Sequence, residues 1–111
     1  METISWNDFT KVDMRVGTII DVEVFDGARI PAYKLKIDFG ELGIKKSSAQ
    51  ITARYQPADL IGKQIIAVVN FPPKQIATFM SECLVLGAIG ENKEVTLLMP
   101  SLGCNNGEKI G

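Results

Sequence analysis

Strict alternation of apolar and polar side chains over residues 12–25 constrains the fold of this chain more than any other feature. The apolar positions are interrupted only at Thr18 and comprise Val12, Met14, Val16, Ile20, Val22 and Val24. The positions between them are largely charged, which predicts a long β-strand with one buried face. Gly17 predicts a bulge or bend within that strand. A small closed barrel requires a long first strand that bends to serve two sheets.

Four further main strands and one short terminal strand are predicted downstream. Residues 33–39 alternate apolar and charged side chains. Residues 44–53 have a weaker periodicity, because Ile44 and Ile51 differ in parity, and a bulge could account for that. Two apolar runs, 64–71 and 83–89, are typical of strands in the core of a barrel. A last short strand over 95–99 ends before Pro100, and residues 101–111 form an irregular tail.

Two short helices complete the prediction. Ser5 and Asp8 have the spacing of an N-terminal helix cap, and Trp6 and Phe9 would share one face of that helix. Residues 57–62 begin with proline and end with glycine, which predicts one helical turn. Five strands with a helical turn between the third and fourth indicate an all-β fold, a five-stranded OB-fold barrel. Other small barrels fit the same pattern.

Composition points to one self-associating domain. At 111 residues the chain has the length of one domain of roughly 100 to 150 residues, so we assign residues 1–111 to it. Its 46% hydrophobic content exceeds what a small monomer needs to bury, which predicts a homodimer. We expect Trp6 and Phe9 to lie in the dimer interface, with the C-terminal residues as a dimerisation extension. No signal peptide and no run of about 20 apolar residues is visible, so we expect a cytoplasmic protein without membrane insertion.

The chain contains no histidine. This absence excludes imidazole-dependent triads, most catalytic zinc sites and the usual general base at neutral pH. Cys83 and Cys104 lie 21 residues apart with no histidine between them, which makes no metal site. We therefore predict a binding protein that is not an enzyme and uses no cofactor or metal.

Residues 70–84 form a segment between the two apolar runs that a Pro-Pro pair keeps out of any helix or central strand. The segment carries the amide of Asn70, the cation Lys74, and two large apolar groups, Phe79 and Met80. This mixture suits holding a polymer. Phe79 and Met80 could bind unfolded polypeptide or pack in the core or dimer, and Asn70 could contact a ligand or only satisfy loop amides.

Positive charge is concentrated in the middle of the chain, where residues 31–80 hold seven Lys and Arg against three Asp and Glu. The lysines of the second and third predicted strands are Lys34, Lys36, Lys45 and Lys46. They could follow a phosphate backbone, or they could only keep an exposed strand edge soluble.

Several separated sequence motifs occur along the chain in the same order as in a known protein family. They are Asp-Met-Arg-Val-Gly at 13–17, Tyr-Lys-Leu-Lys-Ile-Asp-Phe-Gly at 33–40, the turn at 57–63, then Asn70, Pro73 and Ser81. Together they resemble the tRNA-binding OB-fold domain of some bacterial methionyl-tRNA synthetases, a domain that also occurs as a free-standing dimer. Residues 79–87, Phe-Met-Ser-Glu-Cys-Leu-Val-Leu-Gly, most resemble the dimeric chaperone-like members implicated in protein export.

This resemblance implies tRNA or phosphate binding by Lys36, Asn70, Lys74 and Ser81, and binding of unfolded polypeptides or preproteins by the chaperone-like members. The chain departs from the family at Pro72, where a lysine is usual, and at Thr78, where a glycine is usual. It also has Ala-Gln at 49–50 in place of Ser-Gly and Cys-Leu at 83–84 in place of Gly-Met. These departures weaken phosphate binding, so polypeptide binding ranks first, ahead of tRNA binding and of a plain assembly subunit.

Overall fold

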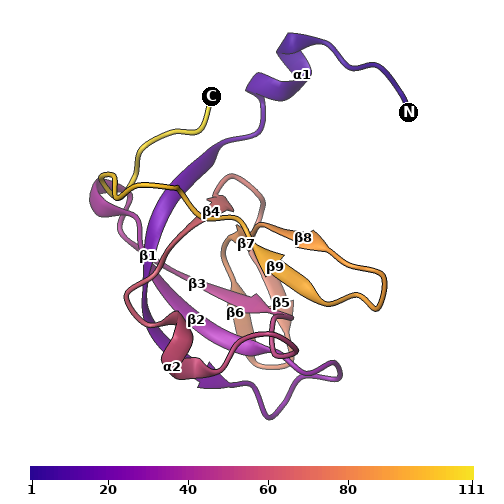
Figure 1. The fold of residues 1–111 in the computed structure, drawn as a ribbon, viewed down its shortest axis with the longest axis vertical. Coiled ribbons are helices and arrows are strands. Elements are labelled where there is room, and N and C mark those ends of the chain that lie inside the picture. The colour runs from indigo at the N-terminus through magenta and orange to yellow at the C-terminus, as the bar shows by residue number, and fades with distance from the viewer.

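The computed structural model describes residues 1–111. The strand β1 (Met14–Val24) organises the barrel, because its first half pairs with β4 (Gln64–Val68) and its second half pairs with β2 (Tyr33–Asp38) (Figure 1). The sheet continues through β3 (Ile44–Ala49) on one side and β7 (Leu84–Val85) on the other, in the order β3-β2-β1-β4-β7.

A few hydrogen bonds bring the two ends of this sheet together. The backbone N–H of Glu82 donates to the carbonyl of Lys46 at 2.7 Å, and the Ser47 hydroxyl donates to the carbonyl of Cys83 at 2.9 Å. The result is a nearly closed five-stranded barrel of mainly β structure, consistent with the predicted OB-fold.

Two hairpins extend from the barrel. One joins β5 (Lys74–Ile76) to β6 (Phe79–Ser81), and the other joins β8 (Gly87–Ile89) to β9 (Val95–Leu97). The short helices are α1 (Trp6–Thr10), the 3-10 turn η1 (Gly40–Leu42) and α2 (Pro57–Leu60). None of these helices has the length and hydropathy needed to cross a bilayer.

The core lies inside the barrel and is built from alternate positions of β1, β2 and β4. Ile19, Leu35, Ile37, Phe39 and Ile65 are almost completely buried, together with Leu60 of α2. Gly17 lies against this core so closely that a Cβ atom there would come within 2.6 Å of Ile37 and 2.7 Å of Phe39. The glycine therefore serves close packing of β1 on β2.

β1 forms as the predicted long strand, but the side chain that faces the core just before the bulge is not the predicted one. The β1–β2 pairing shifts between Ile19 and Asp21, so the bulge lies beyond Gly17. Because side chains alternate between faces, the shift buries Ile19 and exposes Ile20, which was predicted to face the core. Beyond the bulge the predicted face is correct, since Val22 packs against the core, while Val24 is exposed at the end of the strand.

Three other strand predictions need correction. β3 pairs with β2 without a bulge and ends at Ala49, so residues 50–53 lie outside it. The run 83–89 divides into β7 and β8, which belong to different sheets, and several of its side chains are exposed. The segment 70–84, predicted as a loop, contains the β5–β6 hairpin, whose two-residue turn places Ala77 in the left-handed region with φ 54°.

The C-terminal tail is tied to β1. Val16 donates its N–H to the carbonyl of Glu108 at 3.0 Å and accepts from Gly107 at 2.7 Å, and Ile110 donates to Met14 at 2.9 Å. The tail covers the edge of the first half of β1 that β2 leaves free. Its predicted role in dimerisation stays a prediction.

Candidate binding surfaces

Three of the four predicted lysines share the outer face of β2 and β3. Lys36 lies directly opposite Lys46, and Lys34 lies opposite Ser48, with the buried residues of β2 pointing to the other face. Lys45 is opposite the buried Ile37 and therefore belongs to the inner-face positions at the end of β3. The structure thus brings together Lys34, Lys36 and Lys46, which we call the lysine face, and separates Lys45 from them.

Phe79 of the β5–β6 hairpin packs onto the lysine face. Its ring centroid lies 5.5 Å from the Lys34 ammonium and 5.3 Å from the Lys46 ammonium, and the Phe25 ring meets it edge-on at 5.5 Å. Lys34 also lies 4.9 Å from the centroid of Phe25. Ammonium groups over aromatic rings attract them electrostatically, so these contacts hold Phe79 in place beside two cations.

Acidic side chains share the lysine face. Asp21 lies opposite Lys36 in the β1–β2 ladder, and Glu23 lies opposite Lys34. A small hollow of about 50 Å³ is lined by both carboxylates together with the lysines and Phe79. Because opposite charges alternate there, the lysine face attracts a polyanion less strongly than its lysines alone would.

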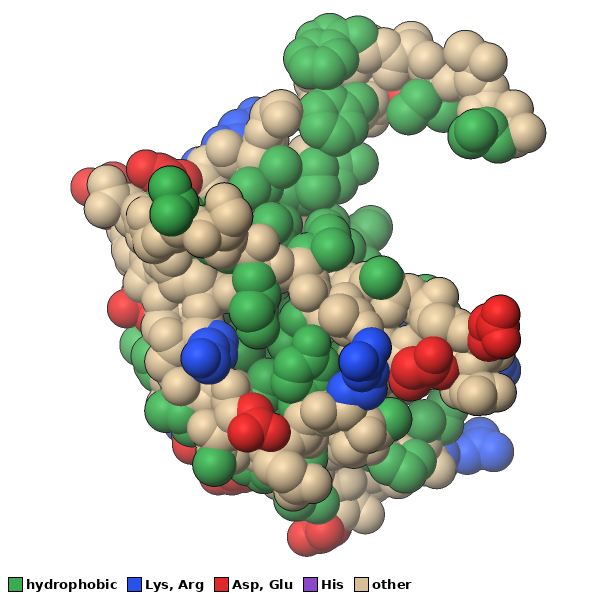
Figure 2. Space-filling view, viewed as in Figure 1, with side chains coloured by type: hydrophobic (Ala, Val, Ile, Leu, Met, Phe, Trp, Pro, Cys, Tyr) green, Lys and Arg blue, Asp and Glu red, His purple; other side chains and the backbone are tan.

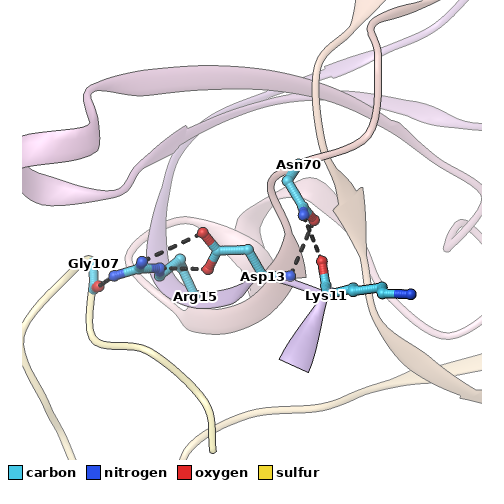
Figure 3. A network of polar contacts seen from close by, with 5 residues as sticks. All are labelled: Lys11, Asp13, Arg15, Asn70 and Gly107. Atoms are coloured by element: carbon cyan, nitrogen blue, oxygen red, sulfur yellow. Dashed lines mark hydrogen bonds and ion pairs between the residues drawn. The ribbon is translucent and has the colours of Figure 1, made fainter. Parts of the chain in front are cut away.

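Asn70 is held by its own chain (Figure 3). Its side-chain oxygen accepts from the Asp13 N–H at 3.0 Å, and its side-chain amide donates to the Lys11 carbonyl at 2.8 Å. The end of β4 is thereby joined to the segment that links α1 to β1. This geometry favours the interpretation that Asn70 satisfies backbone groups, and its predicted role in tRNA binding stays a prediction.

An ion pair continues this network to the C-terminal tail (Figure 3). Arg15 contacts both carboxylate oxygens of Asp13, at 2.6 Å and 3.3 Å, and donates to the carbonyl of Gly107 at 3.0 Å. The hydrogen bonds from Arg15 hold the pKa of Asp13 below its ordinary value. Arg15, which lies within the family-like motif, therefore has a structural task.

Ser81 and Cys83 join the hairpin to β3. The Ser81 hydroxyl oxygen accepts from the Ser48 N–H at 3.1 Å, and Cys83 is buried behind it. Burial raises the pKa of the Cys83 thiol to about 11, so the thiol is neutral and unreactive at physiological pH. The prediction that Cys83 is a small buried apolar group is confirmed. A role of Ser81 in tRNA binding stays a prediction.

Lys74 lies where three hollows meet, on the side of the barrel formed by the two hairpins. The largest apolar one, of about 430 Å³, runs between β3, the β5–β6 hairpin, β7 and the β8–β9 hairpin. We call it the apolar groove, and its apolar walls are Ala49, Ile51, Ile76, Cys83, Leu84, Val85, Leu86, Ile89 and Val95. The groove is completed by Ser48, Gln50, Lys74, Ser81 and Gly87, and no Asp or Glu lines it.

The apolar groove was missed by sequence reasoning. Ile89 is 76% exposed and Leu84 is 48% exposed, although the run that contains them was predicted to be core. Met80, the predicted peptide contact, is 39% exposed on β6, and Phe71 is 53% exposed beside the neighbouring hollow of about 400 Å³. The sequence does carry one signal for the groove: residues 84–89 are apolar on both faces of the strand, whereas a strand in a barrel wall can bury only one face in the core.

The N-terminal helix makes a separate exposed surface. Ser5 and Asp8 form the predicted capping box, and the rings of Trp6 and Phe9 lie 5.3 Å apart on one face of α1. No residue of α1 is buried, and Trp6 is 72% exposed. Figure 2 shows this arm projecting from the barrel, with hydrophobic side chains continuing from it onto the barrel surface. The chain itself leaves Trp6 largely uncovered, and the interface role of Trp6 and Phe9 stays a prediction.

No group of three or more Cys, Asp or Glu side chains comes together in a way that could hold a metal ion. The arrangement offers two chemistries: cation and aromatic contacts on the lysine face, and burial of apolar groups in the groove.

Comparison with known proteins agrees with this geometry. Residues 14–109 match the sequence family described as "Putative tRNA binding domain". Among curated relatives, the methionine–tRNA ligase of Leptospira interrogans is 36% identical over 107 residues, and that of Neisseria meningitidis serogroup C is 38% identical over 113 residues. These alignments cover 96% and 99% of this chain, which spans only 15% and 16% of those ligases.

Two crystal structures of CsaA chaperones are similar over nearly the whole chain. The Bacillus anthracis protein is 55% identical with a TM-score of 0.95, covering 99% of this chain and all of that one. The Picrophilus torridus protein is 58% identical with a TM-score of 0.92, covering 98% of this chain and all of that one. The expected resemblance to free-standing, chaperone-like members is thereby confirmed.

Proposed function

We propose that this chain, which belongs to the tRNA-binding domain family, is a non-catalytic cytoplasmic protein that binds unfolded or export-destined polypeptides as a homodimer. The apolar groove is the observation that carries the proposal. The similarity of nearly the whole chain to two CsaA chaperones adds support.

The apolar groove has the properties that an extended apolar peptide needs. Its volume of about 430 Å³ accommodates a few side chains, and its walls are mainly aliphatic. Ser48, Gln50 and Ser81 supply polar atoms at its margin that can meet peptide backbone groups. Met80 lies on the adjoining β6 strand, and methionine adapts to side chains of varied shape.

The groove proposal predicts that Ile89→Ser weakens binding of an unfolded client. Because Ile89 is 76% exposed, the substitution removes an apolar contact without opening the core. Burial of one such side chain contributes about 1 to 2 kcal/mol, so affinity should fall by roughly five- to thirtyfold. Fluorescence anisotropy of a labelled, permanently unfolded protein measures the client affinity. Suppression of client aggregation is a second readout.

Leu102→Ser is the matched control, since Leu102 is 80% exposed in the C-terminal tail and lies outside the groove. Phe79→Ser tests the hairpin separately, and it should reduce suppression of aggregation if Phe79 contributes to client binding. Equal client binding by the parent, Ile89→Ser and Phe79→Ser would contradict the assignment and leave an assembly role without a ligand.

Binding of tRNA is the second candidate function, favoured by the lysine face and by the family. Lys34 and Lys46 lie over the Phe79 ring and Lys36 lies opposite Lys46, an arrangement of cations and an aromatic ring that can contact phosphates and bases. We place this function below polypeptide binding because Asp21 and Glu23 lie opposite Lys36 and Lys34 and weaken the attraction for a polyanion. Lys45, Asn70, Lys74 and Ser81 belong to this candidate by resemblance.

Salt separates the two functions. Affinity for total tRNA should fall steeply between low and high salt because phosphate contacts release counterions, whereas capture of an apolar peptide should change little. Lys74→Glu should weaken tRNA binding. Tight tRNA binding that survives in Lys36→Glu and Lys74→Glu would contradict the tRNA assignment.

A homodimer would present two grooves and two lysine faces. Two linked sites let weak single contacts combine into useful avidity. We propose that Trp6 and Phe9 of each arm are covered by the second subunit, because the rest of the same chain leaves α1 unburied. A monomer in sedimentation at micromolar concentration would contradict this part of the proposal.

A further inference from the structure

We infer that the cleft beside the apolar groove binds a carboxylate of the polypeptide, so that this protein prefers apolar segments flanked by acidic residues. The cleft, which we call the basic cleft, has a volume of about 550 Å³ and lies between the 26–32 loop and the β5–β6 hairpin. The inference rests on the proposed polypeptide function and adds a ligand preference to it.

The basic cleft carries positive charge without a counter-charge. Its only ionisable lining residues are Arg29 and Lys74, and no Asp or Glu lines it. The two ion pairs of the protein, Lys11 with Asp8 and Arg15 with Asp13, lie elsewhere. Arg29 and Lys74 make no ion pair within the protein, although Glu82 lines the neighbouring hollow that Lys74 also borders. Both cations can pair with an external anion in the cleft, unlike Lys34 and Lys36, which face acidic neighbours across the β1–β2 ladder.

Amide groups extend the capacity of the cleft for an oxyanion. Gln50 and Gln75 line it, and the side chain of Gln50 makes no hydrogen bond within the protein. The Gln75 amide donates to the carbonyl of Ala77, which fixes it at the turn of the hairpin. Small residues on both sides, Gly27 and Ala77, keep the space open.

The basic cleft and the apolar groove are continuous. Ser48, Gln50, Lys74 and Ile76 line both. A single extended chain can therefore place apolar side chains in the groove and an acidic side chain or terminal carboxylate in the cleft. No acidic residue lines either of these two hollows, so an acidic flank meets two cations along this path, and a basic flank is repelled by them.

A polypeptide carboxylate fits this arrangement better than a nucleic-acid backbone. A polyanion carries a charge at every step and needs a run of cations along its track. Here two cations are followed directly by aliphatic walls, which suits one or two negative charges next to apolar groups.

The test compares labelled apolar peptides of one core sequence that differ only in a flanking pair, Asp-Asp, Asn-Asn or Lys-Lys, placed at either end. Anisotropy titrations at low salt should show the best Asp-Asp peptide binding roughly three- to tenfold tighter than its Asn-Asn equivalent, as expected for a partly exposed charged pair. Arg29→Gln should remove most of this preference and leave affinity for the Asn-Asn peptide unchanged. Lys63→Gln, which removes an exposed cation outside both hollows, should retain the preference.

The outcomes separate the two proposals. Equal binding of the Asp-Asp and Asn-Asn peptides by the parent would overturn the carboxylate inference and leave the groove proposal standing. A loss of tRNA affinity in Arg29→Gln with an unchanged peptide preference would also overturn it, because the cleft would then serve phosphate. If none of the peptides binds, the polypeptide function falls and the inference falls with it.

Discussion

Replacing Asn70 by alanine tests whether this residue holds the N-terminal arm or contacts a ligand. The substitution removes two hydrogen bonds, one from the Asp13 N–H at 3.0 Å and one to the Lys11 carbonyl at 2.8 Å. Asn70 is exposed, so water can replace part of each contact. At about 0.5 to 1 kcal/mol net for each bond, Asn70→Ala should destabilise the protein by about 1 to 2 kcal/mol.

Two measurements follow from this magnitude. The midpoint of thermal unfolding should fall by roughly 4 to 8 °C for a domain of this size. Amide hydrogen exchange, followed by NMR, should show the Asp13 N–H exchanging about fivefold faster, because that N–H loses its acceptor. The Val69 N–H, which donates to the Asp13 carbonyl at 2.9 Å, reports whether the end of β4 also loosens.

Asn70→Asp is the matched variant. It keeps an acceptor for the Asp13 N–H and loses the donor to Lys11, so Asp13 should stay protected while the arm weakens. Unchanged exchange at Asp13 in Asn70→Ala, together with lost tRNA binding, would refute the structural role and identify Asn70 as a ligand contact.

Three further predictions concern packing, titration and assembly. Gly17→Ala should cost about 1 to 3 kcal/mol in urea denaturation, because the new methyl group meets the core at 2.6 Å, whereas Gly103→Ala, with no atom within 4 Å, should be nearly neutral. Since burial raises the pKa of Cys83 to about 11 from 9.0 unfolded, the folded state keeps its proton longer, and stability should fall by up to about 2 kcal/mol between about pH 9 and 11. Cys83→Ala should lack that component, and an identical slope in both proteins would assign it to other groups. Trp6→Ser should shift any dimer towards monomer in sedimentation with little change in monomer stability, because Trp6 is 72% exposed.

The sequence predicted those elements whose signals are local. The capping box of Ser5 and Asp8 and the helical turn at α2 depend on spacings of a few residues, and both form as expected. The alternation in β2 placed Leu35 and Ile37 in the core correctly. The class of barrel followed from the order of strands.

Features set by pairing between distant segments were not predictable from local patterns. The position of the β1 bulge depends on register with β2, and no residue near Ile20 announces it. The β5–β6 hairpin forms around a turn that uses Ala77 at positive φ, where glycine or asparagine would have given a signal. Lys45 was grouped with the other lysines because its sequence position, without the register, does not reveal its face.

The apolar excess of the sequence has a definite place in the structure. A strand in a barrel wall buries one face inside, so a run that is apolar on both faces leaves a second apolar face outside. Here that outer face appears at Leu84 and Ile89, and the exposed arm adds Trp6.

A second subunit and a client peptide are the two candidate partners that could cover these apolar surfaces, and they need different surfaces if both bind together. The groove has polar atoms at its margin and an acid-free cleft at its end, which suit an extended chain of varied sequence. The arm offers the two tilted rings of Trp6 and Phe9, 5.3 Å apart, which suit a fixed apolar partner surface. We therefore propose that the arm serves the dimer and the groove serves the client, and this division predicts that client binding leaves the dimer intact.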